Sequence, residues 1–135
     1  MKNLLDKDIE ASIGLQKYYV EVKWHNGTLI MDEPTDIEGK DLGPDPYTTL
    51  LAALAGCTLS TLRMYIDRKG WDIPQISVLL NMHQETENQF TTVIKRIIQF
   101  GEGITDEQKE RLLVIAHKCP VSKILENKIQ INTQA

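Results

Sequence analysis

The sequence predicts an α+β fold in which a mainly antiparallel sheet surrounds one long helix. The first observation is the longest apolar helical pattern of the chain, which runs from Gly43 to Trp71. The second is that segments with alternating apolar and polar residues occur both before and after it. The expected order is β-hairpin, long helix, β-hairpin, second helix and last strand. With 135 residues, the chain is expected to form a single domain over 1–135.

The N-terminal segment predicts a hairpin. Residues 1–10 are a polar lead-in with weak helical character. The alternation within Ile13 to Trp24 is typical of a half-buried strand. Asn26-Gly27 is a strong hairpin signal, and Thr28 to Met31 is the expected return strand.

A turn-rich loop connects this hairpin to the long helix. It covers residues 32–44, and a short extended piece is expected around Ile37. The helix is predicted over Pro46 to Lys69, with Asp45 as its N-cap. Gly70 is placed as a C′ residue that ends the helix.

The long helix has few charges on any side. No ionised residue occurs between Asp45 and Arg63, so the helix is expected to be buried on all sides. One apolar face carries a thiol and consists of Leu50, Leu51, Leu54, Cys57, Thr61 and Met64. The remaining elements of one chain are too few to cover such a helix, which predicts an intimate homodimer with a two-fold axis.

The second half of the chain predicts another hairpin, a helix and a last strand. The two strands are Ile76 to Glu85 and Phe90 to Phe100, with a polar turn over residues 86–89. Thr105 and Gln108 form a capping box that begins the second helix. The apolar face of this helix holds Leu112, Ile115 and Cys119, Pro120 is expected to end it, a short helical turn is expected within residues 121–125, and residues 127–133 are the expected last strand.

Composition and charge limit the classes of function. The net charge of −4 disfavours a nucleic-acid or anionic-membrane partner. No uninterrupted apolar run reaches the length of about 18 residues that a membrane span needs, and the N-terminus does not read as a signal peptide. A cytoplasmic protein is expected. His25, His83 and His117 are scattered and no C-x-x-C motif occurs, so no metal site is expected.

Two cysteines, Cys57 and Cys119, are the candidates for chemistry. They are 62 residues apart, and in a cytoplasmic chain they are not a disulfide framework. By residue type alone, the favoured explanation of each cysteine is a small buried hydrophobic residue. A reactive Cys57 would need a nearby cation or hydrogen-bond donor to stabilise its thiolate. Cys119 lies just before Pro120, where the chain can rearrange, which suits a resolving thiol.

Four segments carry a family resemblance. They are DEPTDIEGKDLGP, GPDPYTTLLAALAGC, TLRMYIDRKGW and HKCPV. Through them the chain resembles the OsmC/Ohr family, proteins related to osmotically inducible protein C and organic hydroperoxide resistance protein. The resemblance covers nearly the whole chain and is closer to the OsmC-like branch. It implies an interwoven α+β homodimer with two active sites at the subunit interface.

The resemblance also implies an activity. In the peroxidase members, a first cysteine attacks an organic hydroperoxide and a second cysteine captures the sulfenic acid as a disulfide. Carried over, Cys57 is the peroxidatic and Cys119 the resolving residue. The reductant is an external dithiol, typically lipoyl-type, and no cofactor is bound. The apolar surroundings of Cys57 favour alkyl or lipid hydroperoxides.

This sequence departs from the peroxidase pattern in two places. The pattern uses an arginine from the N-terminal strands, but no arginine precedes Arg63. It also uses a glutamate early in the central helix, where this chain has Tyr47 and Thr48. The substitute candidates for supporting a thiolate are Lys17, Lys23, Arg63 and Thr48.

Each candidate also has a plain explanation. The two lysines fit a solvated strand face, and Arg63 fits an ion pair with Asp67 four residues on. The candidates for lining a pocket are Tyr47, Leu54 and Tyr65, although packing is the favoured role for both tyrosines. The competing function is a non-catalytic dimer that binds a small apolar molecule. The two functions differ in one geometric expectation, which is that a redox pair must bring Cys57 and Cys119 together within one subunit.

Overall fold

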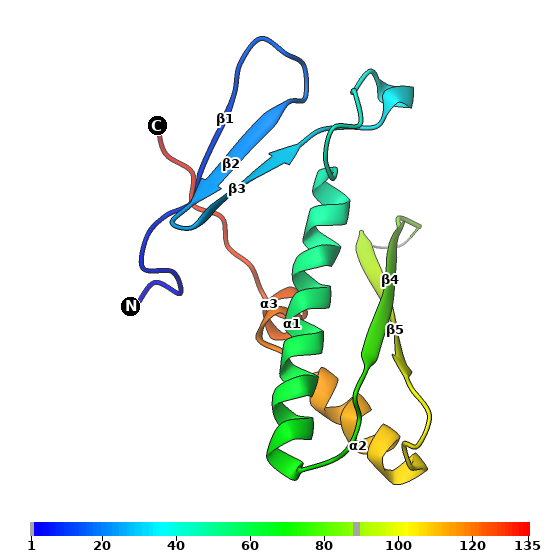
Figure 1. Cartoon of the computed structure of the whole chain (residues 1–135). Coiled ribbons are helices and arrows are strands. Elements are labelled where there is room, and N and C mark those ends of the chain that lie inside the picture. Colours follow the sequence, from blue (N-terminus) through cyan, green and yellow to red (C-terminus); the bar gives the residue numbers. More distant parts are fainter. Residues whose placement is uncertain (1, 88–89) are drawn as a thin grey trace. The chain divides into compact units, whose positions relative to one another are not determined.

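The computed structural model of the protein describes residues 2–87 and 90–135 and has the mixed α+β architecture that the sequence predicts (Figure 1). It contains two compact units, residues 1–50 and residues 51–135, and helix α1 (Pro46–Lys69) runs from the first into the second. The other elements, in order, are β1 (Glu10–Ile13), β2 (Val20–Trp24), β3 (Gly27–Met31), the 3-10 helix η1 (Thr35–Ile37), β4 (Ile76–Glu85), β5 (Thr91–Phe100), α2 (Asp106–Ala116) and α3 (Pro120–Leu125).

The first unit contains a three-stranded antiparallel sheet in the order β1-β2-β3. The predicted turn is confirmed, because Trp24 pairs with Gly27 across a two-residue connection. The prediction of one strand from Ile13 to Trp24 is wrong. The chain turns between β1 and β2, where Tyr18 has a φ of 66°. The weak helix predicted for residues 1–10 is also wrong, since residues 2–9 form no helix and Glu10 begins β1.

A buried carboxylate organises the loop before α1. The Asp32 side chain is only 2% exposed and accepts hydrogen bonds from the backbone N–H groups of Glu33, Lys40 and Leu42. These bonds fold the loop into a closed turn. Its middle is η1, so the extended piece expected around Ile37 is wrong. Gly39 has to be a glycine here, because a Cβ atom would lie 1.8 Å from the carbonyl oxygen of Glu33.

Both ends of α1 follow the sequence signals. The Asp45 carboxylate accepts the backbone N–H of Thr48, as an N-cap does. At the other end, Gly70 has a φ of 67° and the N–H of Trp71 donates to the carbonyl of Ile66 at 3.1 Å. This is a Schellman termination, in which glycine adopts the left-handed conformation without strain.

The buried face of α1 differs from the predicted one. The buried side chains are Leu54, Thr58, Leu62 and Ile66. The predicted face is wrong at both ends, since Leu50 is 41% and Met64 is 60% exposed. The expectation of burial on all sides is also wrong within one chain. Apolar composition does not select a face here, because almost every turn of this helix carries apolar or small residues.

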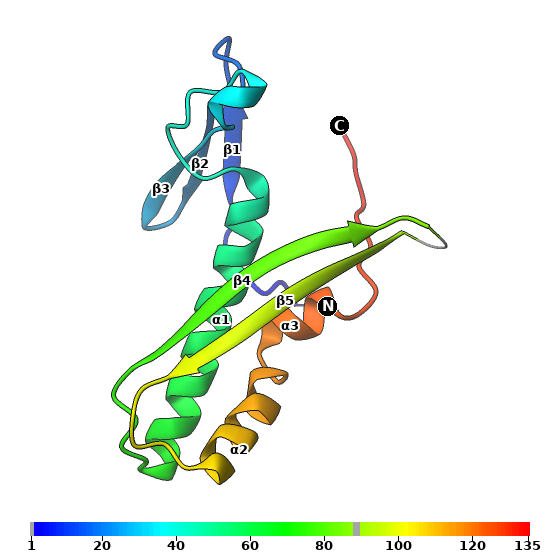
Figure 2. The same cartoon turned by 90° about the vertical axis from the view of Figure 1, so that its right-hand side faces the viewer.

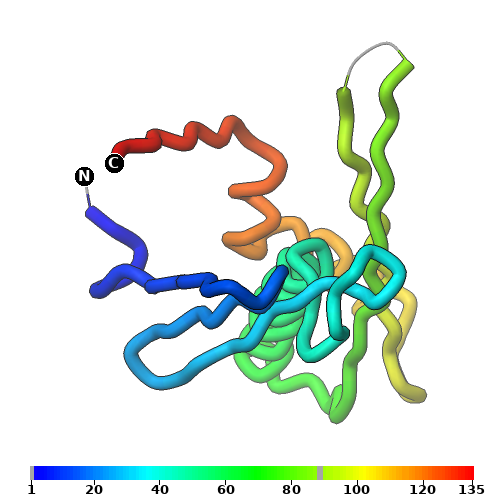
Figure 3. Tube along the Cα trace, turned by 90° about the horizontal axis from the view of Figure 1, so that it is seen from above, coloured from blue at the N-terminus to red at the C-terminus, as the bar shows by residue number. Residues whose placement is uncertain are grey.

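In the second unit, β4 and β5 form a long antiparallel hairpin in which Ile76 pairs with Phe100. Figure 2 shows the hairpin crossing α1 obliquely, and Figure 3 shows β4 and β5 side by side next to the helix and extending away from it. Apolar side chains of the hairpin and of α2 pack against α1 and form the core of this unit. The buried residues of this core are Leu62, Ile66, Ile73, Leu112, Ile115 and Ala116. Both strands are confirmed, and β5 begins one residue later than expected. Residues 88 and 89 of the predicted turn lie outside the described residues.

The C-terminal part is only partly as predicted. The capping box of Thr105 and Gln108 is confirmed at the start of α2. Pro120 does not end this helix, because α2 stops at Ala116 and Pro120 is the first residue of α3. The short helical turn expected within residues 121–125 is confirmed as part of α3. The last strand predicted over residues 127–133 is wrong, since these residues form no strand in the described chain (Figure 1).

By length and composition alone, α1 could cross a lipid bilayer. The central helix of a water-soluble domain meets the same two criteria, so they do not distinguish the two environments.

Candidate active site

The two free thiols of the chain meet in the second unit. Cys57 lies in the middle of α1, and Cys119 is the N-cap residue of α3. The two thiols are close enough to affect each other's ionisation. The Cys57 Sγ also accepts the backbone N–H of Val121 at 3.5 Å. The structure therefore brings the thiols together within one chain, as the redox-pair hypothesis requires.

The pKa values of the two thiols are shifted in opposite directions. Burial raises the pKa of Cys57, and its hydrogen bond to Cys119 raises that pKa further. Burial also acts to raise the pKa of Cys119, but hydrogen bonds from Cys57, from the backbone and side chain of Ser122 and from the backbone of Val121 outweigh it. The net pKa of Cys119 is lower than usual.

The two sulfurs also differ in access to solvent. The Cys119 side chain is fully buried, whereas Cys57 is half-buried. Because a hydroperoxide has to touch the sulfur that it oxidises, Cys57 is the more accessible target in this chain.

Arg96 on β5 connects the two helices that carry the thiols. Its Nη1 donates to the Thr58 Oγ at 2.9 Å and to the Ser122 Oγ at 2.8 Å. Thr58 directly follows Cys57, and Ser122 is three residues after Cys119. The sequence analysis missed Arg96. The signal was its alternation with Ile94 and Ile98 on the inward side of β5, which places a cation in an apolar row.

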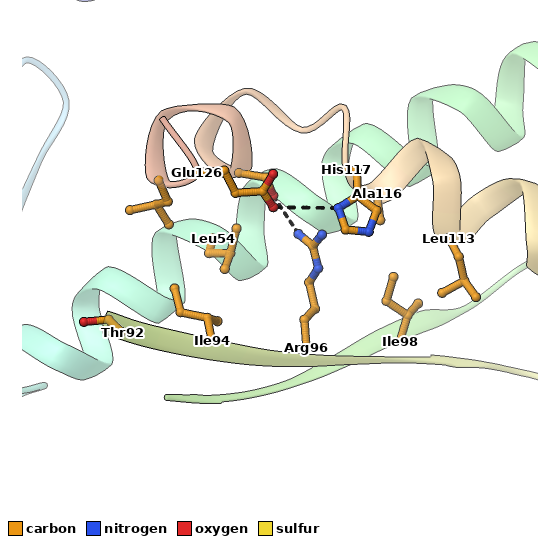
Figure 4. A pocket seen from close by; sticks show the side chains of 11 residues that line it. Leu54, Thr92, Ile94, Arg96, Ile98, Leu113, Ala116, His117 and Glu126 are labelled. Carbon is orange, nitrogen blue, oxygen red and sulfur yellow. Dashed lines mark hydrogen bonds and ion pairs between the residues drawn. The ribbon is translucent and has the colours of Figure 1, made fainter. Parts of the chain in front are cut away.

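A cavity of about 430 Å³ lies beside Arg96 (Figure 4). Its apolar wall comes from α1, β5 and α2 and includes Leu54, Ile94, Ile98 and Leu113. His117 and Glu126 face each other at this cavity, with Nδ1 and Oε1 3.7 Å apart. Neither cysteine lines it. The predicted pocket residue Leu54 is therefore at a cavity, but this cavity is distinct from the thiol pair.

Three of the predicted thiolate-supporting residues have partners inside the first unit. Lys17 is ion-paired with Glu38, and the Lys23 Nζ lies 3.1 Å from the Glu21 Oε1. The Thr48 side chain is hydrogen-bonded to the N-cap residue Asp45. Each of them thus has a local structural role.

Arg63, the fourth candidate, holds the segment after α1. Its Nη1 lies 3.1 Å from the Asp67 Oδ1, which confirms the expected ion pair. Its Nη2 donates to the carbonyl of Ile73 at 2.6 Å and to that of Pro74 at 3.3 Å. These donors are directed at the backbone of a loop and not at a sulfur.

The two tyrosines proposed as pocket walls are placed differently from each other. Tyr47 is 66% exposed and lines neither of the two cavities described in this section. Tyr65 borders a second cavity, of about 650 Å³, between α1 and α2. Its hydroxyl accepts the Nε–H of Arg111 at 2.9 Å, and its ring packs edge-on against Trp71. Tyr65 is thus near α2 and away from the thiols.

Metal chemistry has no obvious site in the part of the chain that the structure describes. Within residues 2–87 and 90–135, no three side chains of His, Cys, Asp or Glu come together as ligands.

Comparison with a family model identifies the chain. The model described as OsmC-like protein matches residues 39–134, which is well over half of the sequence. The chain belongs to the OsmC-like family. The matched region contains both cysteines, Arg96 and all of the second unit except its last residue. A comparison with curated proteins gives no match.

Solved structures share the OsmC-like fold. An organic hydroperoxide resistance protein from Elizabethkingia anophelis is 22% identical, with 96% of this chain and 94% of that chain covered and a TM-score of 0.70. An OsmC like protein from Mycoplasma pneumoniae is 19% identical, with 90% and 89% covered and a TM-score of 0.74. The organic hydroperoxide resistance protein of Bacillus subtilis is 17% identical, with 90% and 91% covered and a TM-score of 0.65. At these identities the likeness establishes the fold.

Proposed function

We propose that this OsmC-like protein is a thiol-dependent peroxidase that reduces organic hydroperoxides in defence against oxidative stress. The observation that carries the proposal is the contact between Cys57 and Cys119, two free thiols from distant parts of the chain. Two structurally similar proteins are described as organic hydroperoxide resistance proteins, which supports the same class of activity.

The proposed reaction has three steps. The Cys57 sulfur attacks the terminal oxygen of the hydroperoxide, which yields an alcohol and the sulfenic acid of Cys57. Cys119 attacks that sulfenic sulfur, which forms a disulfide and releases water. An external dithiol of the lipoyl type then reduces the disulfide by thiol–disulfide exchange and itself becomes a disulfide.

The choice of Cys57 as the attacking residue rests on access, because Cys57 is half-buried and Cys119 is fully buried. Neighbouring residues of α1 such as Leu54 and Leu59 are apolar. An apolar approach favours alkyl or lipid hydroperoxides over hydrogen peroxide. We place the reaction in the cytoplasm, where unpaired thiols stay reduced.

The proposed active form is a homodimer. Apolar side chains remain exposed along the second unit, among them Met64 at 60% and Leu79 at 54%. Exposed apolar surface of this extent is typical of protein–protein contacts.

A non-catalytic binder is the second candidate function, with the cysteines as structural residues. One observation favours it, which is that the 430 Å³ cavity lies apart from the thiols and is lined largely by apolar side chains. In that function, a small apolar molecule would occupy the cavity beside Leu54 and Ile98.

Stopped-flow kinetics with cumene hydroperoxide and dihydrolipoamide test the peroxidase. The wild-type protein should consume the hydroperoxide with multiple turnovers, and Cys57→Ser should abolish consumption. Cys119→Ser is the matched control, because it should oxidise Cys57 once and then fail to form the intramolecular disulfide. Equal turnover in Cys57→Ser and wild type would contradict the assignment of Cys57 as the peroxidatic residue and would favour the non-catalytic binder.

A further inference from the structure

Arg96 carries a positive charge that no carboxylate pairs with in the described residues 2–87 and 90–135. Its Nη1 donates to the hydroxyl of Thr58 at 2.9 Å and to that of Ser122 at 2.8 Å. Its Nε and Nη2 make no hydrogen bond to the described part of the chain. They are not sealed from solvent, because every fully buried side-chain nitrogen or oxygen there has a partner. These N–H groups are therefore open to a ligand.

The hydroxyls that hold Arg96 come from two different helices. Thr58 on α1 is fully buried and Ser122 on α3 is 3% exposed, so water does not compete for these hydrogen bonds. The Thr58 hydroxyl donates its own proton to the carbonyl of Leu54 at 2.7 Å, which leaves its oxygen free to accept from Arg96. A guanidinium group fixed in this way loses little conformational freedom when it binds a ligand.

Arg96 lines the 430 Å³ cavity, whose wall is otherwise largely apolar. Figure 4 shows Arg96 rising from β5 between Ile94 and Ile98, with its guanidinium group directed toward the helices. Leu54 and Leu113 add apolar surface from α1 and α2. Sites for small molecules have volumes of about 300–1,000 Å³ and combine an apolar lining with a few polar groups. A single arginine in such a lining matches a ligand that has an apolar body and an anionic head.

Two further charged side chains line the same cavity. His117 and Glu126 are 70% and 60% exposed, and their Nδ1 and Oε1 atoms lie 3.7 Å apart. Water and salt screen charges that are exposed to this extent. The carboxylate of Glu126 therefore opposes an anionic ligand only weakly, and neutralising it should strengthen binding.

We propose that this cavity binds a small amphipathic carboxylate of the fatty-acid type, with its carboxylate on Arg96 and its chain along Leu54, Ile98 and Leu113. The planar guanidinium group forms paired hydrogen bonds with a carboxylate, which a lysine does not. Because burying part of a charge without a counterion costs free energy, such a ligand stabilises Arg96 where the chain supplies neutral acceptors. The proposal does not depend on peroxidase activity, since neither cysteine lines the cavity. It gives a chemical class to the ligand of the binding function considered above.

Isothermal titration calorimetry with octanoate and octanol compares two head groups on the same apolar chain. The wild-type protein should bind octanoate about tenfold more tightly than octanol, because only the carboxylate makes charged hydrogen bonds with Arg96. Affinity should increase about fourfold with each added methylene from hexanoate to octanoate, as apolar surface is buried. NMR chemical-shift mapping with octanoate should place the largest shifts at Arg96, Ile98 and Leu113.

Variants separate the charge of Arg96 from general effects. Arg96→Met should lower the affinity for octanoate about tenfold and leave that for octanol unchanged. Lys95→Met is the matched control, because Lys95 is the exposed neighbour of Arg96 on β5 and its loss removes the same charge. It should change neither affinity. Glu126→Gln should strengthen octanoate binding, because it removes the opposing charge.

Circular dichroism establishes that each variant is folded. If Arg96→Met does not fold, the comparison of octanoate with octanol in the wild type and the Glu126→Gln variant carry the test. Equal wild-type affinities for octanoate and octanol overturn the proposal, as does an Arg96→Met protein that binds octanoate like the wild type. NMR shifts that map to Cys57 and Cys119 in place of this cavity, or no octanoate binding at millimolar concentration, also overturn it.

The outcome is separable from that of the peroxidase assay, because these titrations contain no hydroperoxide. A protein that binds octanoate through Arg96 but does not consume hydroperoxide refutes only the peroxidase function. A protein that consumes hydroperoxide but does not bind octanoate refutes only this proposal.

Discussion

At the scale of single residues, Cys57 and Cys119 affect each other's ionisation. The pKa of Cys119 is lowered and that of Cys57 is raised, partly because each thiol is hydrogen-bonded to the other. Interacting groups of this kind lose their protons in two macroscopic steps that belong to the pair. Between the two steps, the pair carries one proton and one negative charge.

The pH dependence of the wild-type thiols follows from these directions. We expect two titration steps in the reduced protein, because the pKa of one thiol is lowered and that of the other is raised from the ordinary cysteine pKa. If the pair is a peroxidase, hydroperoxide consumption should rise as the pH passes the first step, because the pair then carries a thiolate. In Cys119→Ser, a single step should lie below the second wild-type step, because the contact that raises the pKa of Cys57 is gone. Identical titrations of the two proteins would show that the thiols are not coupled.

Arg63 is expected to stabilise the fold without affecting the thiols. The variant Arg63→Ala loses the contacts to Asp67 and to the carbonyl of Ile73, so it should lower the free energy of unfolding by about 1–2 kcal/mol. It should not change the thiol titration, because its donors are directed at the loop. Urea unfolding and thiolate absorbance measure the two quantities separately. A shifted thiol pKa in a fully folded Arg63→Ala protein would return Arg63 to the list of thiolate-supporting residues.

The residues of the site were only partly predictable from the sequence. Cys57 and Cys119 stand out because they are the two thiols of the chain and each lies in a motif that resembles a family. Arg96 does not stand out, because its role depends on the pairing of β5 with the Thr58 side of α1. Contacts between residues 38 positions apart, such as Thr58 and Arg96, arise from tertiary packing and have no local sequence signal.

At the scale of elements, local signals were reliable where the backbone itself demands a residue type. Gly70, with its φ of 67°, ends α1, and the capping box of Thr105 begins α2 as expected. The buried face of α1 was missed because the helix carries apolar or small residues all round. Which of these residues become buried depends on where the β4–β5 hairpin packs, and that choice is tertiary.

The loop before α1 gives a test of such a local demand. Gly39→Ala would bring a Cβ atom to 1.8 Å from the carbonyl oxygen of Glu33, so the loop around Asp32 has to shift. We expect a loss of about 2 kcal/mol or more in the free energy of unfolding, as for other substitutions that force backbone strain. Gly14→Ala is the matched control, since no atom lies within 4 Å of its added Cβ. Equal thermal midpoints for the two variants would show that the loop does not constrain Gly39.

At the scale of the whole molecule, one chain leaves its apolar surface incompletely covered. Ile129 and Ile131, at 55% and 84% exposure, lie in the segment that was expected to be a strand. A strand forms only when a neighbouring edge accepts its hydrogen bonds, so the alternating pattern of this segment has no effect in an isolated chain. In the proposed homodimer, an edge of the partner subunit could supply those hydrogen bonds.

Sedimentation velocity tests this assembly. At micromolar concentration we expect the wild-type protein to sediment as a homodimer. Met64→Glu, which places a charge on an exposed position of α1, should shift it toward monomer if this part of the helix lies at the interface. Glu107→Lys at the exposed start of α2 is a control for a change of surface charge. A stable, cooperative wild-type monomer would contradict the dimer.

The central claim is that Cys57 and Cys119 are a working redox pair within one chain. Non-reducing mass spectrometry after one equivalent of cumene hydroperoxide tests it most directly. We expect each chain to lose two hydrogens, peptide mapping to place the disulfide between Cys57 and Cys119, and no crosslink between subunits. Over-oxidised Cys57 with a free Cys119, or two thiols that remain unmodified, would contradict the account.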